Sequence, residues 1–175
     1  MGIRDISEQV MAALEQGRSR NDIFQSLASS APTEAGKIAY CIASVPEAEK
    51  RKQYLMLNGV LCVLLVVYSA LNAMAELPVE PGEPTLFIVL TSLIPLVFAY
   101  FVFRFHGGVY RLAGLWFSID FLENILLKGA PDGLSALKLL TLFGIVFLSF
   151  LIAKKVFPNL GILGPKKDSG GKYLL

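Results

Sequence analysis

The chain of 175 residues is 54% hydrophobic and 17% charged, with 16 Lys and Arg residues against 14 Asp and Glu residues. Soluble domains contain about 45–50% apolar and about 25% charged residues, so this composition excludes an ordinary water-soluble globule. Residues 1–49 nevertheless carry four basic and seven acidic side chains, a net charge of −3. The acidic charge excludes a nucleic-acid-binding head, because such a domain presents a basic surface to phosphate.

Residues 1–45 predict a small head of short helices. Asp5 and Glu8 have the spacing of a capping box at the start of a first helix. Gly17 is a typical C-terminal stop and Ser19 a typical N-cap, so a second helix is expected next, and a third follows it. The turn between the first two helices also suggests a helix-turn-helix unit. The acidic charge favours an ordinary helical hairpin instead.

Four long apolar segments occupy most of the chain beyond the head. Each is close to the ~20 residues that a helix needs to cross a hydrocarbon core of ~30 Å. Within lipid, only a helix satisfies the backbone polar groups of a single segment locally. We therefore expect an all-α fold, an integral membrane four-helix bundle with a small N-terminal helical cytoplasmic head. The expected parts are the head over 1–45, a membrane domain over 46–157 with spans near 55–75, 85–103, 109–127 and 134–153, and a flexible basic cytoplasmic tail over 158–175.

Basic residues flank these segments asymmetrically. Ten Lys and Arg residues fall on the side of the two chain ends and one falls on the other side. Because cytoplasmic loops carry the excess of Lys and Arg, both ends are expected in the cytoplasm and the protein in the cell membrane, plasma or inner. The residues expected at the membrane surface are Lys50, Arg51 and Lys52 before the first span and Lys154 and Lys155 after the fourth.

The third apolar segment is unusual because it contains ionisable side chains. Asp120, Glu123 and Asn124 fall at i, i+3 and i+4, so they share one helical face. Ionisable groups cost about 2.5–3.5 kcal/mol each at mid-membrane and by default indicate a functional site. Three interpretations stay open. We favour a structural ion pair of Glu123 with Lys138 of the fourth segment; the others are an ion or proton site, and an amphipathic helix lying in the membrane interface.

The first span also contains polar side chains, of which Asn58 and Asn72 are most simply interpreted as partners in hydrogen bonds between helices, which contribute ~0.6–2 kcal/mol each. The set comprises Asn58, Tyr68, Ser69 and Asn72.

Few residues suggest catalysis or metal binding. Cys41 lies in the head and Cys62 in the first span, so they are expected to stay unpaired and to act as small apolar fillers. His106 is the one histidine of the chain, which leaves little basis for a zinc site. No nucleotide-binding or nucleophile motif occurs, and we expect no cofactor and no enzymatic activity.

These patterns favour a non-enzymatic membrane protein, a scaffold, assembly or regulatory subunit whose cytoplasmic head engages a partner. The expected partners are the lipid bilayer and either a membrane or cytoplasmic protein or a second copy of the chain, and no nucleic acid. A small ion or solute channel or transport subunit, using the polar face of the third span, is the alternative. A membrane-bound enzyme is the least favoured class.

Overall fold

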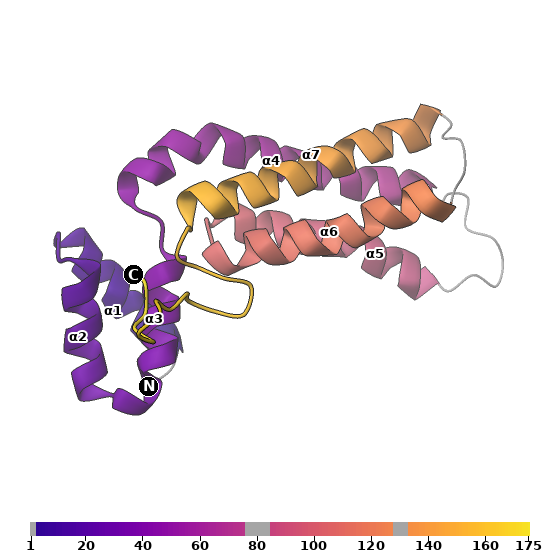
Figure 1. The fold of residues 1–175 in the computed structure, drawn as a ribbon. Coiled ribbons are helices and arrows are strands. Elements are labelled where there is room, and N and C mark those ends of the chain that lie inside the picture. The colour runs from indigo at the N-terminus through magenta and orange to yellow at the C-terminus, as the bar shows by residue number, and fades with distance from the viewer. Residues whose placement is uncertain (1–2, 76–84, 128–132) are drawn as a thin grey trace.

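The computed structural model describes residues 3–75, 85–127 and 133–175. Within these residues the fold is all-helical, without a strand. Three short helices form a head at one end of four longer helices that run side by side (Figure 1). The helices are α1 (Ile3–Glu15), α2 (Arg20–Ser30), η1 (Pro32–Glu34, a 3-10 turn), α3 (Ala35–Ser44), α4 (Ala48–Ala75), α5 (Thr85–Phe103), α6 (Gly107–Leu127) and α7 (Gly133–Val156).

Local sequence signals account for the head helices. Gly17 adopts a φ of +77° just after α1, a conformation that favours glycine at a helix end. Ser19 is the N-cap of α2, and its Oγ accepts from the backbone N–H of Asp22 at 3.1 Å. Both predictions are confirmed. Asp5 lies in the first turn of α1 because the helix already begins at Ile3, so its charge acts on the helix dipole rather than as a cap.

The head buries a core of its own. Arg20 closes the end of α3 by donating to the carbonyl oxygens of Ile42 at 3.3 Å and Val45 at 2.8 Å. These carbonyls would otherwise lack partners at a helix C-terminus. The core comprises the buried side chains of Ile6, Val10, Ile23, Ile38, Cys41 and Ile42. Each of the three head helices therefore contributes its apolar stripe to one shared interior.

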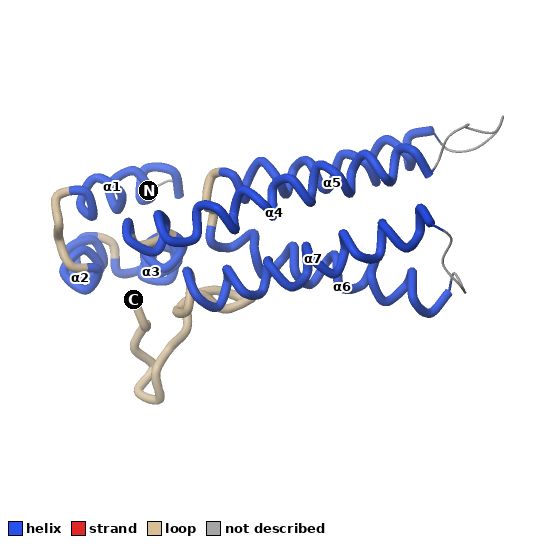
Figure 2. Tube along the Cα trace, turned by 90° about the horizontal axis from the view of Figure 1, so that it is seen from above, coloured by secondary structure: helices blue, strands red, loops and turns tan. Residues whose placement is uncertain are grey.

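The four long helices form a bundle. Helix α4 packs against α5 and α7, and α6 packs against α7. Figure 2 shows the same pairing, with α4 beside α5 and α6 beside α7. A Cβ atom on Gly114 of α6 would lie 2.9 Å from the Phe150 ring of α7, so glycine permits this close approach. The expected segment boundaries agree with the helix bounds within three residues at each end of α5, α6 and α7, and α4 extends its segment toward the head.

Two of these helices, α4 and α7, are long and apolar enough to cross a membrane. Helix α5 has an apolar stretch over Thr91–Phe103, and Pro95 lies inside this helix. Helix α6 is long enough but carries Arg111, Asp120 and Glu123. The charged side chains within its length therefore set α6 apart from α4 and α7.

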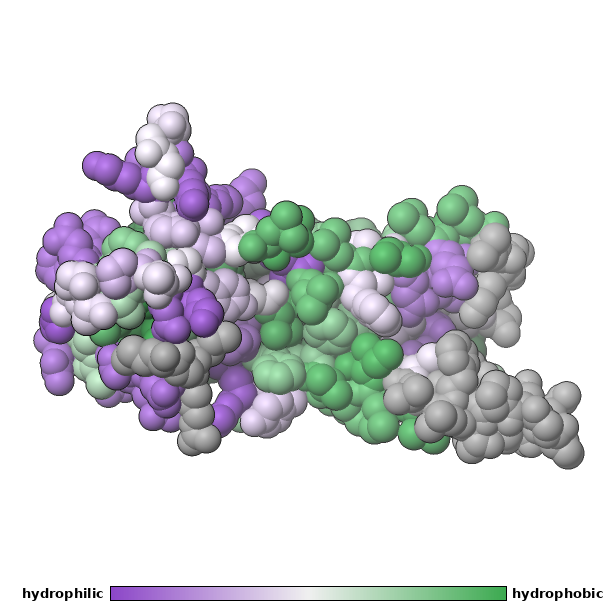
Figure 3. Space-filling model, turned by 90° about the horizontal axis from the view of Figure 1, so that it is seen from below, coloured by the Kyte–Doolittle hydropathy of each residue, from purple (hydrophilic) through white to green (hydrophobic). Residues whose placement is uncertain are grey.

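The outer surface of the bundle is rich in exposed large apolar side chains, which we call the apolar collar. It draws on all four helices, and Figure 3 shows apolar surface over the bundle and mostly hydrophilic surface over the head. Representative members are Val63 on α4, Leu93 on α5, Ile119 and Leu122 on α6, and Leu140 and Phe147 on α7, each 47–68% exposed.

The tail over 158–175 folds back against the head, and its expected flexibility stays a prediction. Two isolated bridges fold it into successive turns, Leu160 with Pro165 and Lys167 with Tyr173. The Tyr173 ring meets the Phe24 ring edge-on at 5.7 Å between centroids, and Leu175 packs against the head core. Because apolar side chains anchor both ends of the tail, it lies against the head instead of extending away from it.

Candidate functional site

A polar cluster lies inside the bundle between α4 and α6. The Tyr68 hydroxyl donates to Oδ2 of Asp120, and Asn124 Nδ2 donates to Oδ1 of the same carboxylate at 2.9 Å. The Lys138 ammonium from α7 lies 5.4 Å from the centroid of the Tyr68 ring. Three of the four residues singled out in the sequence thus gather around one tyrosine. The polar residues of the first span include Tyr68, but only packing shows that it belongs to this cluster.

Glu123, the fourth predicted residue, is exposed on α6 and lines a cavity of about 370 Å³ between α4, α5 and α6. Asp120 lines the same cavity, together with Tyr68, Asn72 and aromatic side chains that include Trp116. Two carboxylates beside aromatic faces make this cavity suitable for water or for a cation. The ion pair of Glu123 with Lys138 stays a prediction.

A second polar network lies nearer the head. Asn58 on α4 donates through Nδ2 to the carbonyl oxygen of Val102 at 2.9 Å and accepts from the Tyr110 hydroxyl at 2.6 Å. The hydrogen bonds between helices expected for Asn58 are therefore confirmed. Leu61 and Leu65 of α4, both fully buried, lie along the helix between Asn58 and Tyr68. Apolar packing thus separates the two polar networks.

The predicted membrane-surface residues gather at the head end of the bundle. Lys50 pairs with Glu47 at 3.0 Å, and the Arg51 guanidinium lies 5.5 Å from the centroid of the Phe105 ring. Lys52 near the start of α4 and Lys154 and Lys155 in the last turn of α7 are exposed. The structure therefore brings the two predicted basic groups, which lie about a hundred residues apart, to one level of the molecule.

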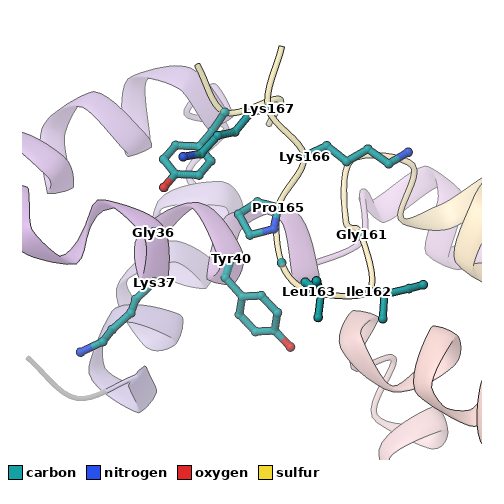
Figure 4. Close-up of a pocket in the computed structure, with 11 residues that line it drawn as sticks. Gly36, Lys37, Tyr40, Gly161, Ile162, Leu163, Pro165, Lys166 and Lys167 are labelled. Atoms are coloured by element: carbon teal, nitrogen blue, oxygen red, sulfur yellow. The ribbon is translucent and has the colours of Figure 1, made fainter. Parts of the chain in front are cut away.

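A larger pocket of about 950 Å³ lies between α3 and the tail (Figure 4), and we call it the head–tail pocket. Lys37 and Tyr40 line it from α3, and Lys166, Lys167 and Tyr173 line it from the tail. The Lys167 ammonium lies 4.8 Å from the centroid of the Tyr173 ring. Sequence reasoning missed this pocket because it exists only when the tail folds back onto the head.

The remaining candidates stay separate from these sites. Burial raises the pKa of the Cys41 thiol, which lies in the head core, and Cys62 Sγ donates to the carbonyl oxygen of Ala99 at 3.7 Å. His106 is exposed, with its ring 5.9 Å from that of Phe101. Among the described residues, no group of three or more His, Cys, Asp or Glu side chains is arranged to hold a metal ion.

Comparison with known proteins yields no relative. No family model, no curated protein and no solved structure matches the chain.

Proposed function

We propose that the protein is a four-span membrane scaffold that holds its helical head at the cytoplasmic face of the cell membrane and presents it to a protein partner. The observation that carries the proposal is the apolar collar. Monomeric soluble proteins rarely expose contiguous apolar patches beyond a few hundred Å², and larger ones indicate contact with a membrane or a partner. A collar contributed by all four long helices suits a bilayer, which surrounds a bundle on every side.

The inward placement of polar groups supports α6 as a full span. The Asp120 carboxylate accepts hydrogen bonds from Tyr68 and Asn124 within the bundle. Because these polar groups have partners inside, α6 can lie in lipid without exposing them to it. The close approach of α6 to α7 at Gly114 further supports a transmembrane helix pair over an interfacial helix. Helix α5 packs along α4, which is itself long enough to span.

The basic residues support the orientation. Lys50, Arg51 and Lys52 lie at the head end of α4, and Lys154 and Lys155 lie at the same end of α7. The positive-inside rule assigns this end to the cytoplasm, with the head and the tail. A reporter enzyme fused after Leu175 should be active only in the cytoplasm, and the protein should resist alkaline extraction from membranes. Activity of that reporter outside the cytoplasm would contradict the topology.

The scaffold role is supported by the way in which the head is fixed to the bundle. Ala43 of α3 belongs to the bundle core, with Tyr40 packed against it. A Cβ atom on Gly107 would lie 2.7 Å from the Phe157 ring and 2.9 Å from the Ser44 carbonyl oxygen, so α3 and α6 meet closely. A head held this firmly presents one face in a constant orientation, as a docking platform requires.

The face of α1 that borders the start of α4, where Met11 and Glu15 line a pocket with Leu55, is the surface that we assign to the partner. Met11 is 45% exposed, and the exposed side chains of Glu8 and Glu15 lie on the same helix. An apolar side chain beside carboxylates suits a partner with a basic rim around an apolar anchor.

A photocrosslinker at Met11 in the full chain should yield one discrete adduct in cells, and Glu8→Gln with Glu15→Gln should reduce its amount. The matched control carries the crosslinker at Gln25, an exposed position on α2, and should yield none. Equal adducts at both positions, or none at Met11, would contradict the assignment.

A cation pathway is the second candidate function, favoured by the cavity that Asp120 and Glu123 line. The buried side chains of Leu61 and Leu65 weigh against a continuous path from this cavity toward the head. Purified protein in liposomes should therefore show no cation flux above that of empty liposomes. A flux that is abolished by Asp120→Asn would favour the pathway over the scaffold.

A further inference from the structure

The first turn of the tail presents two apolar side chains at its tip. The backbone N–H of Gly161 donates to the carbonyl oxygen of Gly164 at 2.7 Å, and that of Lys166 donates to Asn159 at 2.8 Å, which closes the turn. At the tip, Ile162 is 63% and Leu163 102% exposed. The turn is thus held by its backbone, while its two largest apolar side chains stay exposed where they line the head–tail pocket.

The tip lies where the head meets the bundle. Leu160, immediately before it, is fully buried in the bundle core and anchors the turn there. Figure 1 shows the tail leaving α7, extending beside the start of α6 and returning to the head. In Figure 4, Ile162 and Leu163 lie beside Tyr40 among the residues that line the head–tail pocket, on its side toward the bundle helices. The tip therefore lies at the junction of head and bundle, along the head–tail pocket.

Positive charge accompanies the tip. Lys166 and Lys167 follow it and line the head–tail pocket, to which α3 contributes Lys37. The charge of Lys37 is offset by Glu34 at 3.5 Å, whereas the Lys167 ammonium lies over the Tyr173 ring. An apolar tip beside lysines matches the layering of a leaflet surface, in which acyl chains underlie phosphate groups.

We propose that the tip and the head–tail pocket form a binding site for an anionic phospholipid of the leaflet that the head faces. Ile162 and Leu163 insert among the acyl chains, and Lys166 and Lys167, whose side chains extend to opposite sides of the tail in Figure 4, contact phosphate groups on either side of the tip. The proposal rests on the membrane embedding proposed above. A soluble phosphate compound fits the lysines equally well but gives the exposed apolar tip no role, so lipid is the assigned ligand.

Tryptophan quenching separates this proposal from membrane embedding itself. Trp116 is the one tryptophan of the chain and is 48% exposed on α6, so brominated acyl chains should quench it if the bundle lies in the bilayer. In a Trp116→Phe background, Leu163→Trp should also be quenched, and Gln25→Trp on the polar face of α2 should not. Quenching of Trp116 without quenching at position 163 would overturn the lipid site and leave the embedding standing; no quenching of Trp116 would overturn both.

Lipid preference tests the charged half of the site. The full chain, reconstituted in nanodiscs of phosphatidylcholine with about a third phosphatidylglycerol, should retain anionic lipid when transferred to detergent and analysed by native mass spectrometry. Lys166→Gln with Lys167→Gln should lower that retention about tenfold or more, from the energy of two lysines at an anionic surface. Lys154→Gln with Lys155→Gln changes the net charge equally outside the pocket and should lower it clearly less. Equal losses of lipid retention in the two double variants would show that only the overall surface charge matters, and this would overturn the proposal.

A final arm distinguishes lipid from a soluble ligand. Ile162→Ser with Leu163→Ser removes the apolar tip but keeps every lysine, and it should reduce retention of phosphatidylglycerol. Unchanged retention, with displacement of the lipid by millimolar glycerol phosphate, would assign the lysines to a soluble phosphate compound and overturn the proposal.

Discussion

The head and the bundle both bury an apolar core, but they differ in their buried polar groups and in their outer surfaces. In the head the core is apolar, and Met11 is the one large apolar side chain that its described residues leave exposed. In the bundle the buried set includes polar residues, while large apolar side chains cover the outside. The buried polar residues in the described parts of the chain all belong to α4, α6 and α7: Asn58, Ser69, Asn72, Asn124, Thr141 and Ser149.

The difference teaches which solvent each region is built for. Burying apolar surface stabilises the head because water is its alternative. Lipid tails are as apolar as leucine, so a bundle embedded in lipid, as we propose, gains little from hiding apolar side chains and depends on close packing and internal hydrogen bonds. The Asn58–Tyr110 and Tyr68–Asp120 contacts are of this second kind.

The largest difference between the two regions is expected when a charge is placed on the outer surface of each. Val63 on the collar is 61% exposed and Met11 on the head is 45% exposed, so both changes to Asp would be harmless in water. If the collar faces lipid, Val63→Asp costs about 2.5–3.5 kcal/mol near the membrane centre and should sharply lower the membrane-integrated yield. Met11→Asp should leave that yield nearly unchanged. Equal tolerance of both changes, measured by membrane fractionation, would show that the two surfaces face the same solvent.

The polar interior of the bundle should show coupling between residues. Lys138 lies over the Tyr68 ring, and Tyr68 donates to Asp120, so the three share one network. A double-mutant cycle of Asp120→Asn with Lys138→Met should give a coupling of about 1–2 kcal/mol in thermal or denaturant unfolding in detergent. The parallel cycle of Glu123→Gln with Lys138→Met tests the ion pair expected from the sequence. A larger coupling energy in this second cycle would support the ion pair of Glu123 with Lys138.

A smaller effect is expected at the second network. Tyr110→Phe removes the hydroxyl that donates to Asn58 and should lower the free energy of unfolding by about 1 kcal/mol. Tyr100, which is 57% exposed on α5, provides the control, because Tyr100→Phe removes a hydroxyl from the outer surface. Equal effects of the two changes would indicate that the buried hydrogen bond contributes nothing specific.

The smallest effect concerns the reactivity of the head core rather than its stability. Burial raises the pKa of the Cys41 thiol, so less of it is the reactive thiolate at neutral pH. With Cys62→Ser as background, alkylation should be slow in the folded protein and fast in denaturant. As the pH rises, the rate in the folded protein should begin to increase at a higher pH than that of a free cysteine. Rapid alkylation at neutral pH would indicate that the head core opens to water.

Much of the fold could be predicted because helices are local structures. The apolar segments 85–103, 109–127 and 134–153 correspond closely to α5, α6 and α7, since each backbone hydrogen bond of a helix joins residues only four apart. Gly17 and Ser19 likewise marked helix ends through their own conformational and hydrogen-bonding preferences. The face shared by Asp120 and Asn124 also followed from helical spacing alone.

Partners distant in the chain could not be read in the same way. Glu123 was expected to pair with Lys138 because both lie at the same depth in consecutive helices, but depth does not tell which helix faces face each other. The contact of Tyr68 with Asp120, 52 residues apart, depends on how the helices pack. The composition of the basic tail likewise gave no sign that Tyr173 and Leu175 pack on the head or that a pocket forms between head and tail. The sequence by itself determined the helices and their apolar character, because these depend on neighbours along the chain. Only the tertiary structure decided which polar groups meet and where the tail lies, because those contacts depend on how whole helices pack.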